Sequence, residues 1–236
     1  MPSDISVWDV IALLLFFAAW YSIAWVGRHR KDNEKVTLSS ISKNYRNQWM
    51  LHLLERENRM SDVALIGNLM RSVSFFASTS ILILASLIAV FGMVDDAIKI
   101  FHDIPYAQQV SAVFWKLKLF LMVLIFIYAF FKLVWSLRQY NSTVIMIGAA
   151  PDTFNTDEEL FSYANNLGVV LNRSSQHFIE GMRGFEFSLA AMAWFIHPFI
   201  FIFATIFVSL VIYRREFASR TMRAMIDDEG LYKAKS

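Results

Sequence analysis

The 236-residue chain contains no cysteine and no motif that binds a metal or a phosphate. Without cysteine, the chain has no disulfide bond, thiolate nucleophile, iron–sulfur cluster or cysteine-ligated zinc. Histidine and carboxylate residues nowhere cluster at metal-ligand spacing, and the glycines at 181 and 184 lack the strand and lysine of a phosphate-binding loop. A haem held by two histidines is not expected either, because His197 is the only histidine deep in an apolar block. We therefore expect neither a metal nor another cofactor.

Charge is also scarce. Charged residues make up 18% of the chain and hydrophobic residues 56%, which is too apolar for an ordinary soluble domain. The net charge of +2 comes from basic residues in loops beside apolar blocks, so membrane headgroups are expected partners and nucleic acid is not. The first eleven residues hold two aspartates and no lysine or arginine, and we therefore expect the first apolar block to be a retained helix and not a cleaved signal peptide.

The apolar residues collect in four blocks that approach or exceed the roughly 20 residues needed to cross a bilayer. They predict an all-α polytopic membrane protein, a four-transmembrane-helix bundle with spans at residues 5–26, 72–94, 115–137 and 187–213. The last block is free of charge and contains His197-Pro198, where a kink is expected. In the third block, Lys116, Lys118 and Lys132 are expected to extend toward the nearer headgroups.

Two further segments repeat apolar residues at helical spacing and predict amphipathic interfacial helices at 38–66 and 157–184. Thr156 and Glu159 have the spacing of a capping box, so the second of these helices should start there. Spans and interfacial helices together form one transmembrane domain over 1–219. The charged tail at 220–236 is expected to be part helix and part disordered.

The distribution of basic residues favours an outer N-terminus, but it leaves a conflict. With four crossings, residues 27–71 and 138–186 lie inside with nine and three Lys/Arg, whereas the linker and the tail lie outside with one and six. Twelve basic residues inside and seven outside support this orientation, although it places a basic tail on the outer side. Either the long inner segments decide the orientation, or one block does not cross.

Several short stretches resemble a known family. They are NYRNQWM at 44–50, ENRMSD at 57–62, NLMRSVSFFAST at 68–79, SLRQYN at 136–141 and GMRGF at 181–185, followed by Trp194 and Pro198. This order is similar to that of the multi-pass membrane proteins known as domain of unknown function 599, over residues 8–219. The resemblance implies a bacterial-type membrane protein with about four spans, and it implies no activity.

This topology gathers a set of polar residues at the inner membrane face, which we call the inner-face set. Its arginines and amides have the paired donors that suit an anionic headgroup or a phosphate. Three interpretations remain open: the residues pair with one another and with helix ends, they contact headgroups, or they bind a specific ligand. The inner-face set consists of Arg46, Trp49, Arg59, Asp62, Asn68, Arg71, Arg138, Asn141, Asn172, Glu180 and Arg183.

A second candidate site is a polar path along the second and fourth spans, with Ser74, Ser78 and His197 as its residues. Small hydroxyl residues in a span usually serve helix packing, and a lone histidine before a proline is usually structural. A water, ion or proton path is the alternative.

No catalytic constellation is present, so we expect a non-enzymatic protein of the bacterial inner membrane. The expected role is a homo-oligomeric scaffold or an accessory subunit of a larger membrane assembly, with contact to anionic lipid at the inner face. The alternative is a small transporter or channel. An enzyme acting on lipid phosphates would need a nucleophile or a metal carboxylate pair, which the sequence does not offer.

Overall fold

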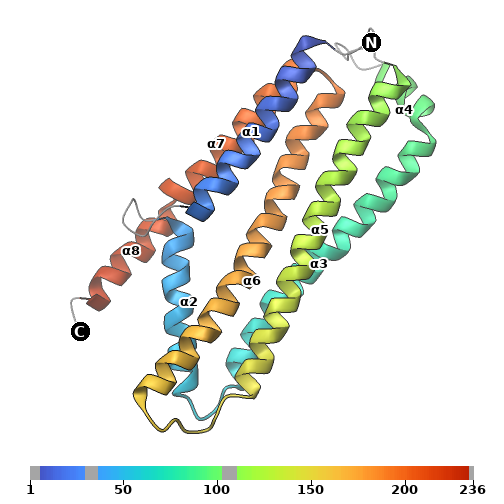
Figure 1. Cartoon of the computed structure of the whole chain (residues 1–236). Coiled ribbons are helices and arrows are strands. Elements are labelled where there is room, and N and C mark those ends of the chain that lie inside the picture. Colours follow the sequence, from blue (N-terminus) through green and yellow to red (C-terminus); the bar gives the residue numbers. More distant parts are fainter. Residues whose placement is uncertain (1–5, 30–36, 103–110, 234–236) are drawn as a thin grey trace. The chain divides into compact units, whose positions relative to one another are not determined.

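The computed structural model describes residues 6–29, 37–102 and 111–233, and within these ranges the chain is helical without a strand (Figure 1). This confirms the all-α class. The elements are α1 (Val7–His29), α2 (Leu38–Leu54), α3 (Met60–Gly92), α4 (Val94–His102), α5 (Ala112–Gly148), α6 (Asp157–Met192), a short 3-10 helix (Ala193–Phe195), α7 (Pro198–Ala218) and α8 (Arg220–Lys233).

In the described part of the chain, four helices are long and apolar enough to cross a membrane. They cover Val7–Trp25, Met60–Gly92, Ala112–Gly148 and Pro198–Ile226, and they confirm the expectation of four long apolar helices. The second and third cover 33 and 37 residues, well beyond the roughly 20 that hydrocarbon requires. Helices α3 and α5 are therefore longer than one crossing requires.

The chain packs as two compact units. Unit 1 comprises Met1–Arg30, Ser78–Phe131 and Glu180–Tyr213, and unit 2 comprises Lys31–Ala77, Lys132–Ile179 and Arg214–Ser236. Helices α3, α5 and α6 each contribute one part to unit 1 and the other part to unit 2. Unit 1 holds the apolar helix segments, and unit 2 holds most of the charge.

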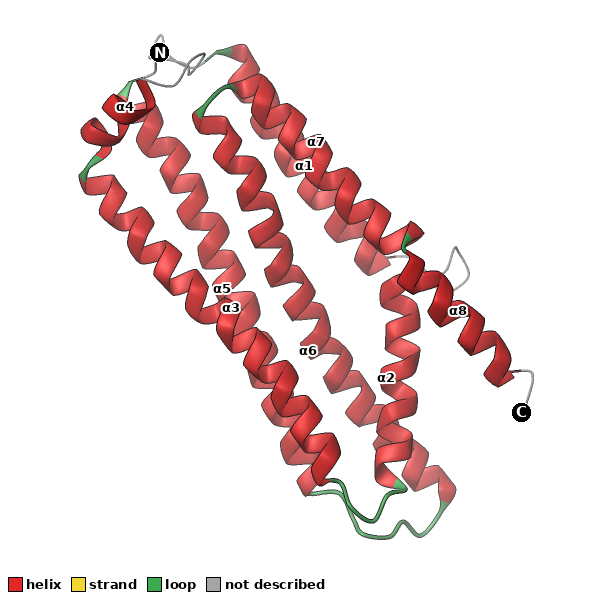
Figure 2. Ribbon diagram, turned by 180° about the vertical axis from the view of Figure 1, so that it is seen from behind, coloured by secondary structure: helices red, strands yellow, loops and turns green. Residues whose placement is uncertain are grey.

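Unit 1 is built around buried aromatic side chains. Phe16 of α1 is fully buried, and its ring lies 5.5 Å from that of Phe187 and 5.2 Å from that of Phe201. Helices α1 and α7 lie side by side in both views (Figure 2). Large apolar side chains such as Ile81 and Phe203 point outward, as expected of helices in lipid.

In unit 2, the helix nearest the C-terminus contacts the helix nearest the N-terminus. Helix α8 packs against α2, where the Tyr45 hydroxyl donates to the Met225 carbonyl at 3.3 Å. The Ser39 amide at the start of α2 donates to Glu216 at 3.1 Å. The region expected to be a partly disordered tail is therefore helical as far as Lys233.

The expected amphipathic helix at 38–66 is two helices. Helix α2 ends at Leu54, and α3 begins at Met60 after a polar run. The side chain of Asn58 accepts a hydrogen bond from the Met60 amide at 2.9 Å and so caps the new helix. Periodic apolar residues alone do not reveal a break of this kind, because the helical repeat resumes after it.

The expected fourth span at 187–213 is also wrong in its bounds, because a turn divides it. Helix α6 ends at Met192, beyond the expected 184, and α7 begins at Pro198, where the chain reverses direction (Figure 1). Proline suits the first position of a helix, which has no intrahelical partner for its N–H. Nδ1 of His197 accepts from the Phe199 amide at 3.3 Å, so His197-Pro198 begins a helix and does not kink one.

The start of α6 agrees with the sequence. The Thr156 hydroxyl accepts from the Glu159 amide at 3.2 Å, and the Glu159 carboxylate accepts from the Asn155 amide at 3.2 Å. The predicted helix start at 156–159 is confirmed.

Candidate functional site

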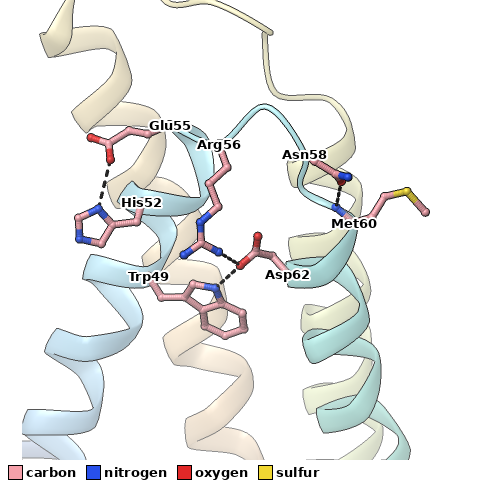
Figure 3. A network of polar contacts seen from close by, with 7 residues as sticks. All are labelled: Trp49, His52, Glu55, Arg56, Asn58, Met60 and Asp62. Atoms are coloured by element: carbon pink, nitrogen blue, oxygen red, sulfur yellow. Dashed lines mark hydrogen bonds and ion pairs between the residues drawn. The ribbon is translucent and has the colours of Figure 1, made fainter.

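The buried carboxylate of Asp62 is the centre of a polar cluster in unit 2 (Figure 3). Asp62 lies in the first turn of α3 and is 0% exposed. Its Oδ1 accepts from the indole Nε1 of Trp49 at 2.7 Å and from Nη1 of Arg56 at 2.6 Å. The helix N-terminus also stabilises a negative charge. Asp62 therefore holds α2, the connecting loop and α3 together.

A second cluster joins α2 to α6. Arg46 Nε donates to Asn172 Oδ1 at 2.7 Å, and Asn172 Nδ2 donates to Asn47 Oδ1 at 2.8 Å. The helices approach closely here, because a Cβ added at Gly168 would lie 2.6 Å from Asn47 Oδ1. Burial lowers the pKa of the Arg46 guanidinium from its ordinary value, although arginine remains charged near neutral pH. The hydrogen-bond acceptor of the Arg46 guanidinium is therefore an amide oxygen and not a carboxylate.

The Arg59 side chain donates hydrogen bonds to main-chain carbonyl groups. Its guanidinium donates to Leu54 O at 3.3 Å, to Ala150 O at 3.2 Å and to Pro151 O at 3.0 Å. Leu54 is the last residue of α2, and residues 150 and 151 follow the end of α5, so Arg59 satisfies carbonyl groups left unpaired at two helix ends. Both terminal nitrogens of this guanidinium therefore donate to the chain itself.

The structure brings only part of the inner-face set together. Arg46 and Asn172 contact each other, as do Trp49 and Asp62, whereas Arg59 contacts carbonyl groups. The remaining members are peripheral or lie elsewhere: Arg71 donates to Asn68 at an exposed position, Arg138 lies 5.5 Å from the Trp135 ring, Asn141 is exposed, and Glu180 and Arg183 belong to unit 1.

Two of the three residues expected to line a path lie one turn apart on α3, and the third lies immediately before the start of α7. Ser74 and Ser78 are exposed on α3 and belong to different units, while His197 sits in the turn before α7 and is partly buried. Among the described residues, no three histidine or carboxylate side chains are placed to hold a metal ion.

Unit 1 contains a buried polar cluster that sequence reasoning missed. The Lys118 ammonium donates to the Trp194 carbonyl at 2.7 Å, and the Trp194 indole donates to Asp9 Oδ1 at 2.8 Å. Lys118 is 0% exposed and Asp9 is 1% exposed. The ammonium also lies 4.8 Å from the centre of the Phe114 ring. This cluster, which we call the Asp9–Lys118 cluster, ties α1 and α5 to the turn between α6 and α7.

The expectation that Lys118 extends toward headgroups is therefore wrong. Its side chain turns inward because an acceptor and two aromatic faces, Phe114 and Trp194, are available inside unit 1. Asp9 was the sequence signal for this site, because it is an acidic residue at the start of an apolar helix. A buried acid inside a span implies a positive partner on another helix.

Four long apolar helices and a helical unit rich in charge define a multi-pass α-helical membrane protein. The chain matches the family described as "Protein of unknown function, DUF599" over residues 11–221. Because this match covers most of the chain, the protein belongs to that family. Neither the curated proteins nor the solved structures contain a match.

Proposed function

We propose that this protein is a non-enzymatic scaffold, or an accessory subunit of a larger assembly, in the bacterial inner membrane. One observation carries the proposal: the inner-face residues that suit a ligand are largely engaged with one another and with helix ends. Asp62, Arg46 and Arg59 each connect two or more segments of unit 2. Their arrangement favours a rigid module over an open binding site.

Exposed apolar side chains on unit 2 support a role in association. Leu65 is 53% exposed and Leu69 is 41% exposed, and they lie one turn apart on α3. Phe161 of α6 is 56% exposed in the same unit. Apolar surface on a unit rich in charge is typical of protein contact sites.

The proposal includes five membrane crossings. In unit 1, the Asp9–Lys118 cluster brings together the starts of α1 and α5 and the turn between α6 and α7. The C-terminal part of α6 runs toward this end and α7 runs away from it. Glu180–Phe195 provides sixteen residues, or about 24 Å of helix, in unit 1, and the uninterrupted α6 supplies the remaining length on the N-terminal side of Glu180. We propose that this segment crosses together with the four apolar helices.

The interior position of this segment explains its lower hydropathy. Phe187, Ala190 and Ala191 are fully or almost fully buried, and a Cβ added at Gly184 would lie 2.8 Å from the Cβ of Ala129 on α5. A helix surrounded by other helices has little contact with lipid and tolerates polar residues on its protected faces.

A fifth crossing removes the conflict in the charge distribution. Residues 27–71, residues 138–179 and the tail then lie on one side of the membrane with nine, two and six Lys/Arg. The opposite side has one, at Lys99. Such an excess of basic residues on one side is typical of the cytoplasmic face.

The scaffold function is tested by the mass of the protein purified in mild detergent. We expect a discrete oligomer or complex, and Leu65→Ala with Leu69→Ala should shift it toward the monomer. The control is Leu82→Ala with Ile88→Ala, which removes exposed side chains from the part of the same helix that belongs to unit 1. A wild-type protein that is strictly monomeric would contradict the proposal.

Transport is the second candidate function, and the Asp9–Lys118 cluster favours it because buried ionisable residues in membrane proteins often mark ion or proton pathways. This function requires flux through vesicles that contain the purified protein. The flux should be lost on Lys118→Met or His197→Ala. Vesicles that show no flux of protons or small ions would exclude this candidate.

A further inference from the structure

Arginines concentrate where α7 leaves its apolar stretch. Residues 198–213 carry no charge, and Arg214, Arg215, Arg220 and Arg223 follow within ten residues. All four are exposed. Among the described residues, no ion pair includes Arg214, Arg220 or Arg223. Arg214, Arg220 and Arg223 thus differ from Arg46 and Arg59, whose hydrogen-bond partners lie within unit 2.

The structure holds these arginines on an ordered surface. Helix α8 turns Met222 and Met225 partly inward, and the Met225 carbonyl accepts from Tyr45 of α2. The Ser219 hydroxyl accepts from the Met222 amide at 3.1 Å and so caps α8 where it follows α7. Arg220 and Arg223 are three residues apart and therefore share one face of α8.

The acid nearest in sequence, Glu216, accepts from the Ser39 amide at the start of α2, and among the described residues no ion pair joins it to these arginines. The acidic residues at 227–229 come later in the chain, so the positive charge lies nearest to the apolar stretch of α7. Anionic lipids attract clusters of this kind that directly follow a membrane-spanning helix.

We propose that Arg214, Arg220 and Arg223 bind the phosphate groups of anionic phospholipids at the membrane surface. The guanidinium group makes paired donor contacts to phosphate oxygens, and the end of an apolar helix places it at headgroup depth. The proposed lipid contact therefore lies at the junction of α7 and α8 and not at the inner-face set, where the sequence suggested it. The surface fixes the end of α7 and the attached α8 against the bilayer.

Native mass spectrometry of the full chain, purified in mild detergent and supplied with phosphatidylglycerol or phosphatidylcholine, tests the proposal. The wild-type protein should retain phosphatidylglycerol in preference to phosphatidylcholine. Arg220→Gln with Arg223→Gln should weaken retention of phosphatidylglycerol about fivefold per arginine, or roughly 25-fold for the pair. Arg220→Lys with Arg223→Lys should keep most of the binding, because the charge remains.

The control variant, Lys116→Gln with Arg173→Gln, removes two exposed cations elsewhere and should retain phosphatidylglycerol as the wild type does. Retention by the wild type that does not distinguish the two lipids would overturn the proposal. So would a Gln variant that unfolds at the wild-type temperature and binds phosphatidylglycerol equally well. The oligomeric state, which tests the scaffold function, should not change in the Gln variant, so the two proposals fail separately.

Discussion

The two units use the same device at the scale of the residue, a buried aspartate that accepts from a tryptophan indole. In unit 2, Trp49 donates to Asp62, and in unit 1, Trp194 donates to Asp9. A buried carboxylate is costly unless its oxygens are hydrogen-bonded. Each of these pairs therefore favours one arrangement of the segments it joins, since any other arrangement removes a donor from a buried carboxylate.

Trp49→Phe tests this device in unit 2. The ring remains but the indole N–H is lost, so Asp62 Oδ1 keeps only the donor of Arg56. We expect a loss of about 1–3 kcal/mol in the free energy of unfolding, measured by thermal unfolding in detergent. Trp8→Phe makes the same change at a side chain that is half exposed and should have a smaller effect. Equal effects of the two substitutions would contradict the role of the indole.

Lys118→Met tests the cluster in unit 1. The substitution leaves Asp9 buried without the lysine charge and deprives the Trp194 carbonyl of its donor. Removing one partner of a buried pair costs about 3–5 kcal/mol, whereas removing both is often tolerated. Adding Asp9→Asn should therefore restore part of the unfolding temperature lost in Lys118→Met. Losses that simply add in the double variant would show that the two charges do not interact.

At the scale of the element, close helix contacts depend on glycine. Gly168 of α6 lies against Asn47, and Gly67 of α3 has open space around it. Gly168→Ala should lower the unfolding temperature, because the new methyl group would displace Asn47 from Asn172. Gly67→Ala should raise it, since alanine favours a helix interior by about 0.5–1 kcal/mol. A higher unfolding temperature in both variants would contradict the close contact at Gly168.

Patterns within one helix were predictable from the sequence, and contacts between helices were largely not. Hydropathy identified the apolar helices, and the spacing of Thr156 and Glu159 predicted the start of α6. The turn at Ala193–Phe195 was missed because 187–213 is free of charge and hydropathy contains no information about chain direction, so Pro198 was interpreted as a kink. Lys118 was missed because its acceptor, the Trp194 carbonyl, lies 76 residues away.

The same limit applies to the inner-face set. Its residue types suggested either mutual pairing or ligand binding. The three-dimensional structure shows which side chains already donate hydrogen bonds within the protein. Arg59 binds carbonyl groups at 54, 150 and 151, which no motif indicates. Arg56, absent from the predicted set, shares Asp62 with Trp49.

At the scale of the whole molecule, the number of crossings decides which segments can act together. With five crossings, α2, α8 and the loop between α5 and α6 share one aqueous phase with all but a few of the basic residues. With four, the tail would be separated from α2 by the membrane, although Tyr45 and Ser39 of α2 contact Met225 and Glu216 in the structure. The contacts between α2 and the tail therefore require an even number of crossings between them, which together with the first span gives an odd total.

Labelling of single cysteines in intact cells with a membrane-impermeant maleimide tests the fifth crossing most directly, because the chain has no cysteine of its own. Thr153→Cys, Ala224→Cys and Asp95→Cys place the probe at exposed positions before α6, on α8 and on α4. The five-crossing arrangement predicts that Asp95→Cys is labelled, whereas Thr153→Cys and Ala224→Cys are both protected until the cells are opened. Labelling of Ala224→Cys together with Asp95→Cys, with Thr153→Cys protected, would contradict it.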